Sequence, residues 1–287
     1  MVAERITKLV EPETSLAYPR LRMSRSSPPA DRPEESAPHA PHPPLPRYYR
    51  RPDERPAFLR DLFDSAAGYY DRLCAVMSFG SGQWYRGFAL RRAGLRRGMT
   101  LLDVATGTGL VARAAAGLVQ SRSSVVGVDP SAGMLREARR AFAGPLAQGR
   151  VEDLPFRDGR FDFVTIGYAL RHAADLEVAF RECLRVLTPG GRLVILEISR
   201  PPTAAMRTAI RLYLTRLLPL LMRAAHARLL MQYYWETIDA CVPPERIMAV
   251  LAAAGFTDIR RKVWGTIQTE YVATKPGAPT LEASRAK

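Results

Sequence analysis

A strand, a glycine turn and a helix, followed by a second strand that ends in a carboxylate, constrain this chain more than any other feature. Thr100–Ala105 is a short apolar run typical of a buried parallel strand, and Thr106–Gly109 turns the chain into an alanine-rich helix. The second apolar strand ends at Asp129. Glycines let the backbone approach a ligand closely, and the helix N-terminus directs N–H groups at it. We therefore expect a nucleoside ligand whose ribose hydroxyls donate hydrogen bonds to Asp129.

Two nucleoside cofactors fit this turn. Gly107–Ala112 satisfies the loose fingerprint of a dinucleotide site, a pattern that is weak when it stands alone. Asp103 favours S-adenosyl-L-methionine (SAM), because an acidic residue just before the glycines can order the turn and lie near the cationic end of that cofactor. The expected contacts of the SAM turn are Asp103, Ala105, Gly107 and Gly109. A turn that only packs a helix against a strand is the structural alternative.

Apolar strands alternate with helical segments along the chain, which predicts a doubly wound, mostly parallel sheet of the α/β class. After the first two strands we expect strands at 146–151, 161–166 and 191–197, and then an antiparallel pair at 259–263 and 266–274, seven strands in all. Ligands of such sheets bind outside the carboxyl ends of the strands. The residues expected at that edge are Gly107, Asp129, Arg150, Gly167 and Glu197.

A helical insertion at 203–234 interrupts the alternation after the fifth strand. It carries arginines among leucines and methionines, and Pro219 is expected to kink or divide it. Two interpretations stay open. The insertion is a helix that caps the sheet, or it is a basic amphipathic surface that meets an anionic membrane or covers an apolar substrate.

The composition of the ends predicts tails on either side of one domain. Residues 1–56 hold 12 of the 23 prolines, so we expect a disordered Pro/Arg-rich tail there, in which His39 and His42 are incidental and hold no metal. The ordered domain is expected at 57–275. Residues 276–287 are expected to form a second disordered tail.

Charge and cysteine content bound the partners and the compartment. The net charge of +14 predicts an anionic partner, unless it reflects only a genome that favours arginine. Three scattered cysteines without a CxxC pattern predict reduced thiols and no metal site. We expect a cytoplasmic protein, with peripheral contact at the inner membrane face and a homodimer both left open. No nucleic acid is expected, because no added RNA-binding module is visible; an RNA methyltransferase is therefore the weaker alternative.

Several motifs carry a family resemblance. DVATGTG at 103–109, VGVD at 126–129, LPFRDGRFD at 154–162 and LTPGGRL at 187–193 resemble the class I SAM-dependent methyltransferases, which have a Rossmann-like fold. YD at 70–71, MSFG at 77–80, ALR at 169–171 and LEIS at 196–199 resemble, more narrowly, the ubiquinone/menaquinone C-methyltransferase family of the UbiE type. The resemblance spans about residues 58–275.

The resemblance implies transfer of the SAM methyl group to a ring carbon of a polyprenylated quinol, an apolar aromatic small molecule. By matching positions it implies that Thr108, Asp129 and Gly167 contact the cofactor and that Arg150 and Val151 face the adenine. Arg150 departs from the family, which has Asn or Asp there as an acceptor for the adenine amino group. A methyltransferase acting on another small molecule or lipid, and a catalytically idle SAM-binding partner in a biosynthetic complex, therefore stay open.

Methylation of a ring carbon requires that the neighbouring hydroxyl lose its proton. We expect Arg171 to stabilise the resulting oxyanion and His172 to act as the general base. Tyr70 is expected to hydrogen-bond the substrate or cofactor, and Tyr234 and Trp235 to cover the prenyl tail. Because neighbouring side chains in an extended segment point opposite ways, Arg171 and His172 need not both face the pocket.

Overall fold

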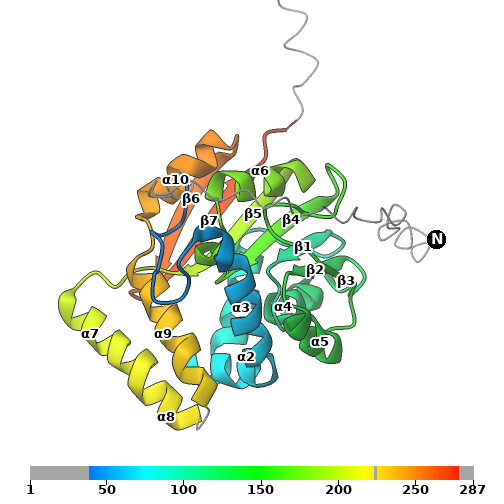
Figure 1. The fold of residues 1–287 in the computed structure, drawn as a ribbon. Helices are drawn as coiled ribbons and strands as arrows, with labels where there is room; N and C mark the ends of the chain where they lie inside the picture. Colours follow the sequence, from blue (N-terminus) through cyan, green and yellow to red (C-terminus); the bar gives the residue numbers. More distant parts are fainter. Residues whose placement is uncertain (1–38, 223–224, 278–287) are drawn as a thin grey trace, which may run out of the picture. The chain divides into compact units, whose positions relative to one another are not determined.

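The computed structural model describes residues 39–222 and 225–277, in which seven strands form one sheet (Figure 1). The strand order is β3-β2-β1-β4-β5-β7-β6, with β7 antiparallel to both neighbours and all other pairs parallel. The strands are β1 Leu101–Val104, β2 Val125–Asp129, β3 Leu146–Gln148, β4 Phe161–Gly167, β5 Leu187–Ile198, β6 Thr257–Trp264 and β7 Gln268–Thr274. The predicted mostly parallel, doubly wound sheet is confirmed.

Helices occupy both faces of the sheet and cross its ligand-binding edge (Figure 1). They are η1 Pro52–Glu54, α2 Arg55–Met77, α3 Gly82–Arg92, α4 Leu110–Val119, α5 Ala132–Ala141, η2 Leu170–His172, α6 Leu176–Val186, α7 Ala204–Leu212, η3 Tyr213–Leu217, α8 Leu218–Met222, α9 Ala225–Asp239 and α10 Pro244–Ala253. Apolar residues of α6 and α10 pack on one face of the sheet, and those of α3 and α4 pack on the other.

The predicted insertion is a set of consecutive helices, α7 to α9. A π-helical turn, η3, stands directly before Pro219, which is the second residue of α8. Proline offers no N–H to the carbonyl four residues before it, so the wider π turn re-routes the backbone hydrogen bonds at this point. The insertion is therefore divided near Pro219, as predicted, and α9 continues past the predicted end to Asp239.

The prediction of a disordered tail over 1–56 is wrong for residues 39–56, and residues 1–38 lie outside the described ranges. Tyr49 is 5% exposed. The carbonyl of His39 accepts a hydrogen bond from Leu176 N at 3.0 Å, and that of Pro41 accepts one from Val242 N at 2.8 Å. Residues 39–51 form no regular helix or strand, in keeping with their prolines, but their carbonyls and aromatic rings still pair with the domain. The predicted tail at 276–287 lies outside the described residues from 278 onward.

The N-terminal segment, α2 and the insertion share an aromatic cluster beside the sheet. The ring of Tyr48 lies 5.1 Å from that of Tyr233 and 5.6 Å from that of Phe58, between ring centroids. Leu62, Leu73 and other buried residues of α2 pack against α8 and α9 in the same cluster. The insertion thereby caps one end of the sheet, which is the first of the two interpretations, while the outer sides of α7 and α8 remain exposed.

Candidate active site

The glycine turn is built on Asp103, which is buried inside β1. Its carboxylate accepts hydrogen bonds from Thr106 Oγ1 at 2.6 Å, Thr165 Oγ1 at 2.8 Å and Ala112 N at 3.1 Å. Burial raises the pKa of Asp103 to about 6, against the lowering effect of these donors. Asp103 therefore orders the turn, as expected. Its carboxylate lies behind the turn, so the further expectation that it approaches the cofactor's cationic end stays a prediction.

Asp129 stands at the carboxyl end of β2, where the sequence places the ribose site. Oδ2 accepts a hydrogen bond from Gly107 N and Oδ1 accepts one from Ser131 N, each at 2.8 Å. A carboxylate offers about four acceptor positions, so about two remain for the two hydroxyls of a ribose. The Asp129 geometry thus fits SAM, and the same contacts tie the strand end to the glycine turn.

Backbone geometry keeps the floor of the site open. Gly107 has φ +57°, and a Cβ placed on it would meet nothing within 4 Å. A Cβ on Gly167 would lie 2.6 Å from Val111 Cγ2, so β4 and α4 approach as closely as glycine allows. Ala105 and Tyr168 also adopt positive φ, +53° and +62°, which non-glycine residues rarely do. Such strained positions cluster at binding sites, and these two lie at the tips of β1 and β4.

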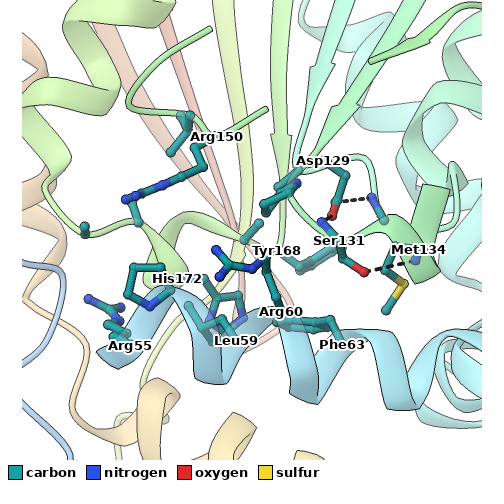
Figure 2. A pocket seen from close by; sticks show the side chains of 18 of the residues that line it. Arg55, Leu59, Arg60, Phe63, Asp129, Ser131, Met134, Arg150, Tyr168 and His172 are labelled. Atoms are coloured by element: carbon teal, nitrogen blue, oxygen red, sulfur yellow. Dashed lines mark hydrogen bonds between the residues drawn. The ribbon is translucent and has the colours of Figure 1, made fainter. Parts of the chain in front are cut away.

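Two adjoining pockets open at this edge. The first runs from Asp129 to His172, with Arg150 beside it and α2 along the other wall (Figure 2). The second has a cavity volume of about 530 Å³ and extends from the glycine turn toward α3, η3 and the β6–β7 hairpin. Both pockets share Tyr70, Ala105, Gly107, Gly167, Tyr168 and Tyr234. A ligand in one therefore meets a ligand in the other at these residues.

The structure places most of the predicted catalytic and cofactor-binding residues on the walls of these two pockets. The predicted residues that line a pocket are Tyr70, Ala105, Gly107, Thr108, Asp129, Arg150, Val151, Gly167 and His172. Of the predicted catalytic and cofactor-binding residues, Asp103, Gly109 and Arg171 line neither pocket, and Glu197, expected at the same edge of the sheet, also lines neither. The individual roles assigned to all of them stay predictions.

Two carboxylates of α2, to which the sequence analysis gave no role, hold this helix against the site through hydrogen bonds. Asp64 accepts hydrogen bonds from Ser131 Oγ and, at 2.8 Å, from Gly133 N, where α5 begins. Asp71 accepts one from Thr108 Oγ1, where α4 begins. Seven residues separate the two aspartates, so both lie on one face of α2. This i, i+7 acidic pair opposite two helix N-termini was the available sequence signal.

His172 lies at the wall of the first pocket, where its ring packs against aromatic side chains. Its ring centroid lies 5.3 Å from that of Phe63 and 5.6 Å from that of Tyr233. Neither ring nitrogen has a hydrogen-bond partner within the described residues. Burial, and then the charges of Arg171 and Arg55, lower the pKa of His172 well below 6.5. The imidazole is therefore neutral at physiological pH and has a free lone pair, although it is a weaker base than the sequence suggested.

Tyr70 and Tyr234 stand where the two pockets meet. Their hydroxyl oxygens are 2.7 Å apart, and burial raises the pKa of both phenols. Both side chains are consequently neutral hydroxyls at physiological pH, able to donate a hydrogen bond. The second predicted covering residue, Trp235, faces away from these pockets and lines a groove between α7 and α9.

Arg171 is fully buried beneath Tyr234 and forms an ion pair with Glu197. Its guanidinium carbon lies 4.4 Å from the ring centroid of Tyr234. Nε and Nη2 have no hydrogen-bond partner among the described residues. Arg171 lines neither pocket and lies behind the Tyr234 ring, so the structure does not provide the direct contact expected with a substrate oxyanion. Chain direction explains this, since Arg171 and His172 point to different sides of η2.

Arg150 and Val151 follow β3 and line the first pocket, where the sequence places the adenine. Arg150 Nε lies 3.2 Å from Glu152 Oε2, and its side chain is 44% exposed. The guanidinium is thus held by the Glu152 carboxylate, and Figure 2 shows Arg150 beside the pocket. Pro130, Met134 and Val151 supply apolar walls beside it. Although Arg150 replaces the family's Asn or Asp, the apolar walls on this side of the pocket can still hold a planar base.

Within residues 39–222 and 225–277, no group of three His, Cys, Asp or Glu side chains is arranged to hold a metal ion. None of the helices described there is long and apolar enough to cross a membrane.

A doubly wound sheet with an antiparallel β7 and an acidic tip on β2 bound to the glycine turn is the fold of the class I SAM-dependent methyltransferases. The model of the ubiE/COQ5 methyltransferase family matches residues 51–275, and the chain belongs to this family. The family match makes SAM the cofactor. The resemblance inferred from the motifs is confirmed, as is the assignment of the chain as an enzyme.

Individual relatives agree with the family assignment. The demethylmenaquinone methyltransferase of Symbiobacterium thermophilum is 35% identical over 240 residues, which cover 78% of this chain and 95% of that one. The ubiquinone/menaquinone biosynthesis C-methyltransferase UbiE of Serratia proteamaculans is 34% identical, covering 72% and 86%. A SAM-dependent methyltransferase structure from Thermotoga maritima aligns with a TM-score of 0.53 at 19% identity, covering 75% and 99%, and so shares the fold.

Proposed function

We propose that this methyltransferase acts on a ring carbon of a polyprenylated quinol. The observation that carries the proposal is the pair of adjoining pockets. One has the Asp129 carboxylate that fits a ribose, and the other is a larger cavity beyond Tyr70 and Tyr234 with aromatic and apolar walls. Relatives named for demethylmenaquinone and ubiquinone/menaquinone methylation support the same substrate class.

The walls of the second pocket suit an apolar tail. Met77, Phe79, Ile210, Tyr213 and Leu214 line it from α2, the loop that follows, α7 and η3. Burial of apolar surface contributes about 25 cal/mol for each Å² removed from water, so these walls favour an isoprenoid over a polar substituent. Its polar lining comes from Thr106 and Thr108 of the glycine turn, and also from Ser78, Ser81 and Arg86 near α3 and Gln268 of β7.

The residues at the junction supply what a quinol needs. SAM, when bound, supplies a methyl group already activated on a sulfonium centre, so the protein mainly positions the acceptor and excludes water. One of the Tyr70 and Tyr234 hydroxyls donates to the other, which leaves the second free to donate a hydrogen bond to the substrate oxygen as it gains charge. The neutral His172 imidazole can accept the phenolic proton. Arg171 lies under the Tyr234 ring and favours negative charge on that side.

A direct assay tests the proposal. The purified protein is incubated with SAM and a reduced 2-prenyl-1,4-naphthoquinol, and products are analysed by mass spectrometry and NMR. We expect S-adenosylhomocysteine and a product methylated on the ring carbon beside the prenyl group. Methylation on oxygen, or methylation of an unprenylated phenol at equal rate, would favour another small-molecule acceptor. SAM binding without turnover on any quinol would favour the idle-partner alternative.

A further inference from the structure

The outer side of α7, η3 and α8 exposes large apolar side chains. Leu214, Leu218 and Met222, spaced four residues apart, are buried in the aromatic cluster with α2 and α9. Leu212 and Leu220 lie on the opposite side of the same helices and are 54% and 73% exposed. We call this exposed surface the leucine–arginine face. Its members are Leu212, Leu217, Leu220, Leu221, Arg211 and Arg216.

The charge of this face has one sign. Between Glu197 and Glu236 the sequence contains six arginines and no carboxylate. The carboxylates that follow on α9 are already engaged, since Glu236 pairs with Arg47 and Asp239 pairs with Arg200. Arg211 and Arg216 are exposed and, with Arg47, line the groove between α7 and α9. The face therefore combines apolar side chains with a positive field that its own helices do not neutralise.

The leucine–arginine face adjoins the mouth of the second pocket. Phe79 is 86% exposed and stacks on Tyr213, with 6.0 Å between ring centroids and 22° between ring planes. Both rings line that pocket, and Tyr213 belongs to η3, directly before Arg216 and Leu217. In Figure 1, α7 and α8 lie on the far side of α9 from the sheet. An apolar molecule that leaves the second pocket past Phe79 thus emerges on the side of the protein that carries the leucine–arginine face.

We propose that the leucine–arginine face docks on an anionic lipid bilayer. The leucines enter the boundary between headgroups and acyl chains, and the arginines pair with lipid phosphates, as in interfacial amphipathic helices. Docking places the Phe79 mouth of the second pocket against the membrane. The occupant is a lipid surface rather than a second protein copy, because two copies of a face with this charge would repel each other.

Vesicle flotation tests the proposal with the purified full chain and no methyl acceptor, so its outcome is independent of the proposed function. Vesicles of phosphatidylcholine with about 30% phosphatidylglycerol are compared with pure phosphatidylcholine. We expect binding to the anionic vesicles that weakens as salt is raised. Leu220→Ser/Leu221→Ser should weaken partitioning about ten-fold or more. Arg211→Gln/Arg216→Gln should weaken it about five-fold for each arginine.

Val178→Ser is the matched control, because Val178 is an exposed apolar residue on α6, which packs on the sheet away from the insertion. It should partition as the wild type does, and all variants should retain SAM affinity and thermal stability. Absence of binding to the anionic vesicles, or binding that the leucine variant leaves unchanged, overturns the proposal. So does a wild-type dimer in sedimentation that the leucine substitutions convert to a monomer, since the face would then bind a second copy.

Discussion

The hydroxyl oxygens of Tyr70 and Tyr234 lie 2.7 Å apart, although 164 positions separate the two residues in the chain. The contact joins α2, whose Asp71 accepts a hydrogen bond from Thr108 of the glycine turn, to α9 of the insertion. It also closes the wall at which the two pockets meet. The cofactor side and the proposed acceptor side are therefore coupled through one pair of phenols.

Removing either the Tyr70 or the Tyr234 hydroxyl should break the same hydrogen bond. We expect Tyr70→Phe and Tyr234→Phe each to lower the free energy of unfolding by about 1 kcal/mol and to reduce kcat about 100-fold. The double variant should lose little more, because both changes delete one hydrogen bond. Denaturant melts and a double-mutant cycle on kcat measure this. Tyr69→Phe is the control, since the Tyr69 hydroxyl has no partner within the described residues; additive losses would contradict the coupling.

Asp129 should determine SAM affinity. Asp129→Ala removes the remaining acceptors for ribose and leaves the Gly107 and Ser131 N–H groups unpaired. Two hydrogen bonds to a charged group correspond to about 3 kcal/mol or more, so we expect at least a 100-fold loss in calorimetric titration with SAM. Asp175→Ala is the matched control, because Asp175 also accepts two backbone N–H bonds, at the start of α6. It should lower stability by about 1 kcal/mol and leave SAM affinity unchanged.

SAM affinity should fall as the pH falls through about 6. Burial raises the pKa of Asp129 to about 6, so its carboxylate is charged above that pH and protonated below it. Protonation converts acceptor capacity into a donor, and affinity should decrease about ten-fold for each further pH unit. Titrations with SAM between about pH 5 and about pH 8 measure the slope. His172→Gln should leave the profile unchanged, because the pKa of His172 is lowered out of this window. A flat profile would contradict the assignment.

The Arg171–Glu197 pair should matter first for stability. Both side chains are buried, so Arg171→Ala leaves the Glu197 charge unpaired and should cost about 3–5 kcal/mol of unfolding free energy. Arg171→Met/Glu197→Leu removes both charges and should recover most of this loss. Chemical denaturation compares the variants. If the double variant is stable and fully active, Arg171 has no part in turnover; if Arg171→Ala alone unfolds as the wild type does, the pair is not structural.

The segment before η1 should contribute to stability. A chain that begins at Arg51 lacks the buried ring of Tyr49, the half-buried ring of Tyr48 and the His42 partner of Arg55. Burying one such ring contributes about 1.5–3 kcal/mol, so we expect a loss of about 3 kcal/mol or more relative to a chain that begins at His39. Thermal and urea melts of the two truncations measure the difference. Equal stability of the two truncations would mean that residues 39–50 behave as the disordered tail that their proline content predicts.

The sequence by itself determined the local order of this protein. The apolar runs and glycine positions predicted the strands, the turn at Gly107 and the carboxylate at Asp129, because these depend on spacing along the chain and on backbone conformations that neighbouring residues dictate. The helical insertion and its division near Pro219 followed for the same reason. The family motifs then fixed the cofactor, and the comparisons confirmed the family.

Tertiary structure decided which side chains reach the site. Asp64 and Asp71 fasten α2 to helices that begin about 40–70 positions later, Arg171 turns inward to Glu197, and Tyr234 meets Tyr70 across the domain. The segment 39–56 becomes ordered only because α6 and α9 offer partners to its carbonyls and rings. Such contacts depend on how the elements pack rather than on local spacing, since desolvation and pairing of a buried group are set by residues far away in the sequence.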